Sequence, residues 1–215
     1  MAGRMSASLS GDASLELPEF DTPPASPLDL ARAWLADAED REVSEPLSMT
    51  LATADAEGRV SARTVDVKRI EDDGLVFGSS TLSPKGRQLA ANPHAALQVY
   101  WRETMQQLRF EGRAVQLSDA ESDALFADRS PKSRAATAIA DQSDVLEPRT
   151  LQDLIDDANT LLADTDDDVP RPVGWVAWRL EPDVVEFWHG SRDRMHRRLQ
   201  YVRTPDGWDA ARLQP

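Results

Sequence analysis

The stretch SMTLATADAEGRVSARTVDVKRIEDDGLVFGSS, residues 48–80, decides the fold. Apolar residues, many of them β-branched, alternate with polar ones along most of it, and a period of two is the pattern of a half-buried strand. The runs DAEG, at 55–58, and DDG, at 72–74, interrupt the alternation and are typical of tight turns. We therefore expect antiparallel strands joined by hairpins. The strands predicted here are residues 48–54, 60–70 and 75–79.

The same pattern continues after this stretch, with short helices between the strands. Residues 85–91 predict a helix that Asn92-Pro93 stops, and Gly112 is a predicted bulge in a long strand. Short turns between many strands favour a small barrel over a parallel sheet. The expected fold class is α+β, mainly β, with peripheral helices. The further strands are predicted at 95–101, 106–117, 174–180, 184–188, 198–203 and 208–213.

The remaining segments divide the chain. Residues 1–16 are small and polar and predict a disordered tail, and residues 17–46 predict an extended, Pro-rich arm followed by a helix over 28–42. Residues 47–215 are expected to form the barrel domain. The acidic loop 164–172 lacks the glycine and distal Glu of a calcium loop, so we expect a solvated loop. Further helices are predicted at 120–128, after a Ser118–Glu121 capping box, at 133–140, and at 150–163, where the apolar residues share one face.

Composition excludes several classes of function. The 215 residues include no cysteine, which excludes disulfides and thiolate metal sites and fits a cytoplasmic protein. The three histidines lack zinc-ligand spacing, so no metal site is expected. No apolar run is long enough to span a membrane, and residues 1–14 lack the apolar core of a signal peptide. A formal net charge of -14 argues against nucleic-acid binding.

A basic stretch, EFWHGSRDRMHRR at 186–198, stands out in this acidic chain. Clustered arginines repel one another, so an anion or several carboxylates should lie among them. An aromatic ring, Trp188, beside them favours a flat ligand with an anionic end. Residue types alone also allow a solvated turn whose arginines pair with surface Asp and Glu. The basic residues are Arg192, Arg194, Arg197 and Arg198, with His196 among them.

Two other segments are candidate phosphate sites. RTVDVK, residues 63–68, carries a cation at each end of a predicted strand, which suits a long anionic ligand, although edge-strand charges also serve to block aggregation. GSSTLSPKG, residues 78–86, opens a helix with hydroxyls and Lys85 but lacks P-loop spacing. Gln106-Gln107 and Gln142-Ser143 are suited to reading the edge of a heterocycle, or are ordinary surface residues.

Taken in order, these segments resemble the pyridoxamine 5′-phosphate oxidase family. The resemblance covers about residues 47–215. YWRETMQQ at 100–107, the arm LPEFDTPPASP at 17–27 and the ending RLQP at 212–215 look still closer to one branch, the phenazine-biosynthesis flavin oxidases of the PhzG type. The pieces that carry the resemblance are Arg63-x4-Lys68, Ser83-Pro84-Lys85, Gln107, Gln142-Ser143, and Glu186-Phe187-Trp188 followed by Arg194-Met195-His196 and Arg198.

The resemblance implies a split β-barrel that forms homodimers and holds FMN in clefts between the subunits. Arg63 and Lys85, helped by Ser79, would then bind the FMN phosphate, and Lys68 would lie near both the ring and the substrate. The implied FMN site is Arg63, Thr64, Val65, Asp66, Val67, Lys68, Gly78, Ser79, Lys85, Gln107, Gln142, Ser143, Trp188 and Arg198, some from the partner chain. The implied substrate site is Lys68, Arg129, Ser133, Arg194 and His196, with Arg194 and His196 also catalytic.

The implied activity is oxidation, and so aromatisation, of a reduced phenazine carboxylate or dicarboxylate late in phenazine biosynthesis. In this hypothesis a hydride would pass to FMN, O2 would reoxidise the flavin, and His196 is a candidate proton acceptor. Two residues depart from the vitamin B6 enzymes of the family: Pro84 replaces an Arg for the flavin phosphate, and Leu125 replaces a Tyr that contacts the substrate phosphate. The alternatives are a pyridoxamine/pyridoxine 5′-phosphate oxidase and a non-catalytic flavin-binding module.

Overall fold

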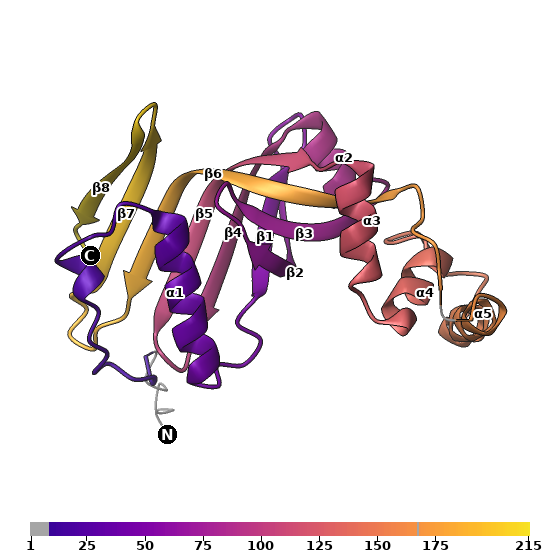
Figure 1. The fold of residues 1–215 in the computed structure, drawn as a ribbon, viewed down its shortest axis with the longest axis horizontal. Coiled ribbons are helices and arrows are strands. Elements are labelled where there is room, and N and C mark those ends of the chain that lie inside the picture. The colour runs from indigo at the N-terminus through magenta and orange to yellow at the C-terminus, as the bar shows by residue number, and fades with distance from the viewer. Residues whose placement is uncertain (1–8, 167) are drawn as a thin grey trace, which may run out of the picture.

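The computed structural model describes residues 9–166 and 168–215, and its centre is a closed antiparallel barrel (Figure 1). Its strands follow the order β3-β2-β1-β4-β5-β6, and pairing of β3 with β6 closes the ring. The expected α+β, mainly β barrel with peripheral helices is confirmed. The strands of the barrel are β1 (Ser48–Ala54), β2 (Val60–Ile70), β3 (Leu75–Ser80), β4 (His94–Trp101), β5 (Gln106–Gln116) and β6 (Trp175–His189).

Strand β6 is where the barrel splits. Its first part pairs with β3, and its last part pairs with β7 (Arg197–Thr204), which in turn pairs with β8 (Gly207–Leu213). The sequence predicted two strands here, and this was wrong, because β5 pairs with β6 on both sides of Pro182. The ladder is irregular where the sequence predicted a bulge, since Glu111 pairs with Val184 and Gly112 with Pro182, but the extra residue is Asp183 in β6 and not Gly112 in β5. A Cβ at Gly112 would lie 2.0 Å from the Glu181 carbonyl oxygen, so only glycine fits there.

One face of the sheet near the split is covered by helix α1 (Pro27–Asp40). The helix starts where predicted, because the Ser26 hydroxyl accepts the Asp29 N–H at 3.1 Å. Trp34 packs edge-on against Phe187, with ring centroids 5.0 Å apart. The core therefore runs from the inside of the barrel to the space between α1 and the inward-facing residues of β5, β6 and β7.

The N-terminal arm lies on the body, as predicted. The Tyr201 hydroxyl donates to the Pro24 carbonyl at 2.9 Å, and Pro18–Phe20 forms one 3-10 turn (η1) where the sequence predicted extended chain. Asp12 donates its N–H to the Glu103 carbonyl at 2.8 Å, so this part of the predicted tail lies against the turn between β4 and β5. Residues 1–8 lie outside the described residues, and the division of the chain into tail, arm and barrel stays a prediction.

The remaining helices are peripheral. Helices α4 and α5 pack against each other, away from α1 (Figure 1). The apolar face predicted on α5 forms, but the single chain buries none of its residues. Within residues 9–166 and 168–215, no helix is long and apolar enough to cross a membrane. The four helices are α2 (Pro84–Ala91), α3 (Asp119–Ala127), α4 (Pro131–Ile139) and α5 (Leu151–Asp164).

Candidate functional site

The side chain of Arg63 is half-buried among neutral oxygens. It points from the inward-facing side of β2, and burial lowers the pKa of its guanidinium. Nη1 donates to the Leu51 carbonyl at 3.1 Å and to the Thr53 hydroxyl at 2.6 Å. Nη2 donates to the Ser61 hydroxyl at 2.5 Å and to Gln88 Oε1 at 3.4 Å. Among the residues that the structure describes, the guanidinium is thus held in place without a carboxylate in contact.

Lys85 lies beside Arg63 at the start of α2. The Ser83 hydroxyl caps this helix by accepting the Gly86 N–H at 3.2 Å, and Pro84 occupies the first turn. The ammonium donates to Gln142 Oε1 at 2.8 Å and to the Ser83 hydroxyl at 3.4 Å. Burial, and after it the nearby charge of Arg63, lower the pKa of Lys85 to about 8.

These two cations form what we call the cradle: Arg63, Lys85 and their neutral partners. Among the described residues, neither cation has a carboxylate within ion-pair distance. Ser79 lies on the adjacent strand β3, and its buried hydroxyl has no hydrogen-bond partner within the described chain. A buried and a half-buried positive charge, with a hydroxyl that has no partner among the described residues, fit an anion with several acceptor oxygens.

Arg129, in the loop between α3 and α4, is a further, half-buried cation. Its guanidinium lies 5.1 Å from the Trp175 ring centroid and 5.5 Å from that of Phe126. Burial lowers its pKa, the charge of Asp66 raises it, and its Nη1 is buried with no hydrogen-bond partner among the described residues. The Trp175 ring fills the space that a Cβ at Gly78 would occupy, at 2.1 Å. Gly78 therefore makes room for the ring on which Arg129 stacks.

The other side of β2 faces outward, as the alternation predicted. Thr64, Asp66 and Lys68 are exposed, whereas Val67 is buried. Asp66 accepts from the Ser48 hydroxyl at 3.1 Å and pairs with the Lys68 ammonium at 3.5 Å. Val65 is half-buried on the inward side. The strand therefore presents different groups to the barrel and to the outer face.

A second group of predicted site residues lies on the outer face near the end of β6. Gln107 accepts from the Gln98 amide at 3.0 Å. The Trp188 ring lies 4.8 Å from that of His196. Arg198, the strand partner of Trp188, donates from Nε and Nη2 to Glu186 at 2.8 and 3.1 Å, and this carboxylate raises its pKa.

The tautomer of His196 follows from one contact. Its Nδ1 accepts the Ser191 N–H at 3.0 Å. A neutral imidazole with Nδ1 as acceptor carries its proton on Nε2. In this geometry His196 therefore presents a hydrogen-bond donor, and it would have to give up the Ser191 contact to accept a proton.

The other predicted site residues are placed on loops and a helix. Arg194 is exposed and adopts a left-handed backbone with φ of 73°, and its N–H donates to the Ser191 carbonyl at 3.2 Å. Ser143, next to the Lys85 partner Gln142, is also left-handed, with φ of 78°. Ser133, in the first turn of α4, accepts from the Ser130 hydroxyl at 2.9 Å.

One chain does not bring its two groups together. The β-ladder pairs Thr64 with Thr50, Thr50 with Gln98, Gln98 with Arg109, and Arg109 with Glu186. Four strand spacings separate the ends of this row, which is about 19 Å along the sheet. A tricyclic ring that lies on Thr64 to Lys68 is shorter than this row of strands, so it does not extend along it to Trp188 or Arg198 of the same chain.

Sequence reasoning missed residues that complete both groups. Thr53 and Gln88 hold Arg63, Trp175 carries Arg129, and Glu186 holds Arg198. Two of them had a local signal: Gln88 follows Lys85 by about one turn on the same helix, and Glu186 begins the basic stretch 186–198, where carboxylates were expected. Thr53 and Trp175 lie on strands that do not contain their partners, and no such signal marks them.

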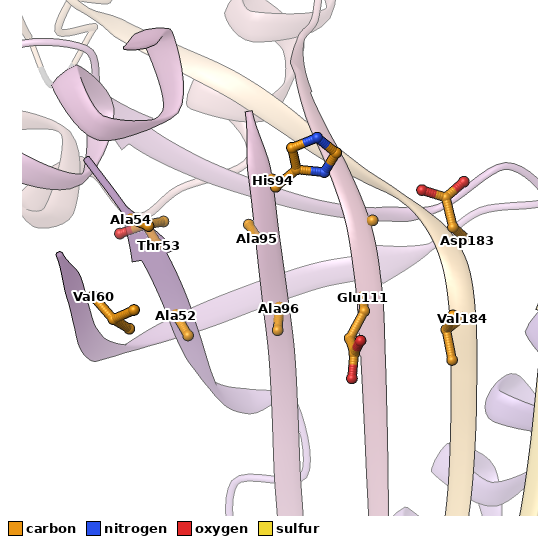
Figure 2. Close-up of a pocket in the computed structure, with 11 residues that line it drawn as sticks. Ala52, Thr53, Ala54, Val60, His94, Ala95, Ala96, Glu111, Asp183 and Val184 are labelled. Carbon is orange, nitrogen blue, oxygen red and sulfur yellow. The ribbon is translucent and has the colours of Figure 1, made fainter. Parts of the chain in front are cut away.

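An open hollow of about 420 Å³ lies elsewhere on the outer face (Figure 2). Small side chains from β1 and β4, such as Ala52 and Ala96, form its floor, and His94, Glu111 and Asp183 also line it. None of the predicted site residues lines it. Among the described residues, no group of three His, Asp or Glu side chains is placed to hold a metal ion.

Two regions of the chain match known families. Residues 35–154 match pyridoxamine 5′-phosphate oxidase, and residues 175–215 match the pyridoxine 5′-phosphate oxidase C-terminal dimerisation region. The chain belongs to the pyridoxamine 5′-phosphate oxidase family. The resemblance inferred from the sequence is confirmed, and the second match supports a homodimer, because it covers β6, β7 and β8.

Members with two different activities are equally similar to this chain. It is 41% identical over 208 residues to a dihydrophenazinedicarboxylate synthase of Burkholderia lata, a match that covers 97% of each protein. It is also 41% identical over 203 residues to a pyridoxine/pyridoxamine 5′-phosphate oxidase of Paraburkholderia phymatum, with 94% and 93% covered. Within the family, overall identity does not separate the two activities.

One solved structure extends the likeness to the phenazine branch. PhzG from Burkholderia lata, crystallised with tetrahydrophenazine-1-carboxylic acid, matches the fold with a TM-score of 0.90. The two chains are 40% identical, and the match covers 95% of this chain and 100% of the other. The family and this fold support an oxidoreductase, and the choice of substrate depends on individual site residues.

Proposed function

We propose that this chain is a cytoplasmic, FMN-dependent oxidase that aromatises a reduced phenazine carboxylate or dicarboxylate late in phenazine biosynthesis. The observation that carries the proposal is the cradle, where Arg63 and Lys85 share a site without a carboxylate among the described residues. A phosphate monoester carries close to two negative charges at neutral pH, which matches these two cations.

The residues present fit FMN. Arg63 and Lys85 would hold its phosphate, and the unpartnered Ser79 hydroxyl would donate a further hydrogen bond. Pro84, in place of the family's arginine, offers no charge, so the two remaining cations and α2's first backbone N–H groups carry the binding. The chemistry that bound FMN supplies is two-electron oxidation: the substrate loses a hydride and a proton, and O2 gains them as hydrogen peroxide.

We infer that each site is shared between two copies of the chain. The distance along the sheet between Thr64 and Glu186 supports this, since Gln107, Trp188 and Arg198 would then come from the partner subunit. The alanine-lined hollow of Figure 2 supports it too, because it adjoins β6 within the dimerisation region and would be covered by a second copy.

The residues around Arg129 favour a carboxylate substrate over a B6 phosphate. Leu125 is 3% exposed and packs in an apolar cluster with Phe126 and Trp175, so no hydroxyl stands where the B6 enzymes present one. The free Nη1 of Arg129 and the guanidinium of Arg194 suit carboxylates. Lys68, Ser133 and His196 would add donors around the same substrate, with His196 donating from Nε2.

Steady-state assays test the choice of substrate. The purified chain, loaded with FMN, should form hydrogen peroxide with a reduced phenazine carboxylate and turn over pyridoxine 5′-phosphate far more slowly. Faster turnover of pyridoxine 5′-phosphate would overturn the proposal in favour of the B6 activity. Stoichiometric flavin that never cycles under O2 with either substrate would favour a non-catalytic flavin-binding module.

The variant His196→Ala tests the substrate side of the site. Loss of one neutral donor should lower kcat/KM about tenfold while FMN remains bound. Ser191→Ala keeps the backbone N–H that orients His196 and serves as the matched control. Release of FMN from the His196 variant, with an unchanged rate per bound flavin, would show that the histidine acts on the cofactor instead.

A further inference from the structure

Glu186 is a buried acid on the outer face, with an exposed fraction of 3%. Its carboxylate binds two arginines from the strands on either side of β6. Arg198 on β7 donates to it at 2.8 and 3.1 Å, and Arg109 on β5 donates at 2.6 Å. Acidic side chains are rarely buried this completely, so a carboxylate that is buried between two guanidinium groups calls for a specific role.

Arg198 is held from two sides by these contacts. Nε and Nη2 bind Glu186 in the bidentate geometry that fixes the plane of a guanidinium, and Nη1 donates to the Gln214 carbonyl at 3.2 Å. A guanidinium has five N–H donors. Three are engaged within the described chain, so two remain for a ligand beside Trp188, the strand partner of Arg198.

The ion pairs around Glu186 extend to a second acid. Arg109 also pairs with Glu111 at 3.0 Å, so Glu111, Arg109, Glu186 and Arg198 form a row of alternating charges that we call the clamp. Its formal charge is zero, since it has two acids and two bases. Because the charges of the clamp cancel, it has no net positive charge to attract an anion. The cradle does have one.

We propose that Glu186 is a positioning residue that acts through Arg198. It fixes the guanidinium so that its two remaining N–H donors meet hydrogen-bond acceptors of the ring system at Trp188. The inference rests on the proposed function, because it takes that ring to be the flavin of a shared site. The competing reading is that Glu186 only joins β5, β6 and β7.

A double-mutant cycle separates the two readings. The variants are Glu186→Gln, Arg198→Ala and the pair together, and the readout is FMN affinity, from flavin fluorescence as FMN is added to the flavin-free protein. Each single change should weaken binding about tenfold, as expected when charge-assisted hydrogen bonds are no longer fixed. If Glu186 acts through Arg198, the double variant should bind no more weakly than Arg198→Ala.

Glu111→Gln is the matched control, because it removes the other carboxylate that pairs with Arg109 without touching Arg198. It should bind FMN within about twofold of the unmodified chain. Effects that multiply in the double variant, or a Glu186→Gln protein that binds FMN normally, would overturn the inference. An unmodified chain that binds no FMN would instead refute the proposed function, and the inference with it.

A second variant covers the case in which Glu186→Gln does not fold. Arg198→Lys keeps the positive charge beside Glu186, so no buried charge is left unpaired, but an ammonium cannot make the bidentate contact that fixes the guanidinium plane. The inference expects FMN affinity to fall about threefold, the loss of one modest hydrogen bond. Unchanged affinity in this variant counts against a role for Arg198 orientation.

Discussion

The cradle and the clamp are both built around arginine, and they differ in what balances the charge. In the clamp, Arg198 and Arg109 face carboxylates of the same chain, and the row is neutral. In the cradle, Arg63 and Lys85 face only hydroxyls, amides and carbonyls among the described residues. Cations that have no carboxylate partner therefore mark a site for an anion better than the number of cations does.

The largest expected effect comes from removing a cradle cation. Arg63→Ala takes away one of two charges that would hold the phosphate, so FMN affinity should fall about a hundredfold, the scale of two charge-assisted hydrogen bonds. Titration of flavin-free protein with FMN measures it. The neutral partners Thr53, Ser61 and Gln88 can turn to water, so the variant should fold.

Arg179→Ala is the matched control for this experiment. Arg179 lies on β6 and pairs with Asp73 and Glu181, each at 2.8 Å. Its loss should leave FMN affinity within about threefold, because its charge is already balanced. If the Arg179 variant loses as much FMN affinity as the Arg63 variant, the lack of a carboxylate partner does not explain the effect of Arg63.

A smaller effect should follow from pH, because the cradle contains a lysine with a lowered pKa. The pKa of Lys85 is lowered to about 8, so the free protein loses this charge as pH rises through 8. The phosphate of FMN stays doubly ionised over that range. FMN affinity should therefore be highest below pH 8 and fall about tenfold by pH 9, since binding then requires uptake of a proton.

Two controls test whether Lys85 is the group that causes the pH dependence of FMN affinity. Lys85→Arg keeps its charge at pH 9 and should flatten the profile. Riboflavin lacks the phosphate and should bind with little dependence on pH. In the clamp, Glu186 raises the pKa of Arg198, so this group stays charged throughout. A pH dependence that persists in Lys85→Arg would assign the titration to another group.

What the sequence predicted well was local. Strand alternation and the Ser26 and Ser118 caps each depend on a few neighbouring residues, and the structure has all of them; the bulge predicted at Gly112 is at the right place in the ladder but in the other strand, at Asp183. The two predicted strands around Pro182 are one strand, because pairing with β5 carries the ladder past a residue that cannot donate. That information resides in β5, far away in the sequence.

In the candidate site, too, the sequence predicted the residue types but not the contacts between distant residues. The arginine-rich stretch 186–198 was expected to hold an anion or several carboxylates, and the structure pairs Arg197 with Asp21 and Arg198 with Glu186. Asp21 is 176 residues from Arg197, so no local pattern reveals the pair. Nor does any spacing show that Arg63 and Lys85, on a strand and a helix, share one site.

The smallest expected effect tests the paired side of the comparison, at Asp21 in the arm. Asp21 is 74% exposed and lies 3.3 Å from Arg197 and 3.6 Å from Arg212. Exposed ion pairs contribute little, so Asp21→Asn should change the free energy of unfolding by about 0.5 kcal/mol or less and leave FMN affinity unchanged. Urea unfolding at low and high salt measures it, and the small difference should vanish at high salt.

The Arg197 side chain explains why so little should be lost. Its Nη2 also donates to the Leu17 carbonyl at 3.0 Å, and its guanidinium lies 4.6 Å from the Phe20 ring centroid. Both contacts survive in Asp21→Asn, so the arm keeps its attachment to β7. A loss of FMN affinity in this variant would mean that the arm acts on the site through the loop before Arg197. Balanced cations would then matter to binding as much as the cradle does, and pairing would no longer distinguish the two regions.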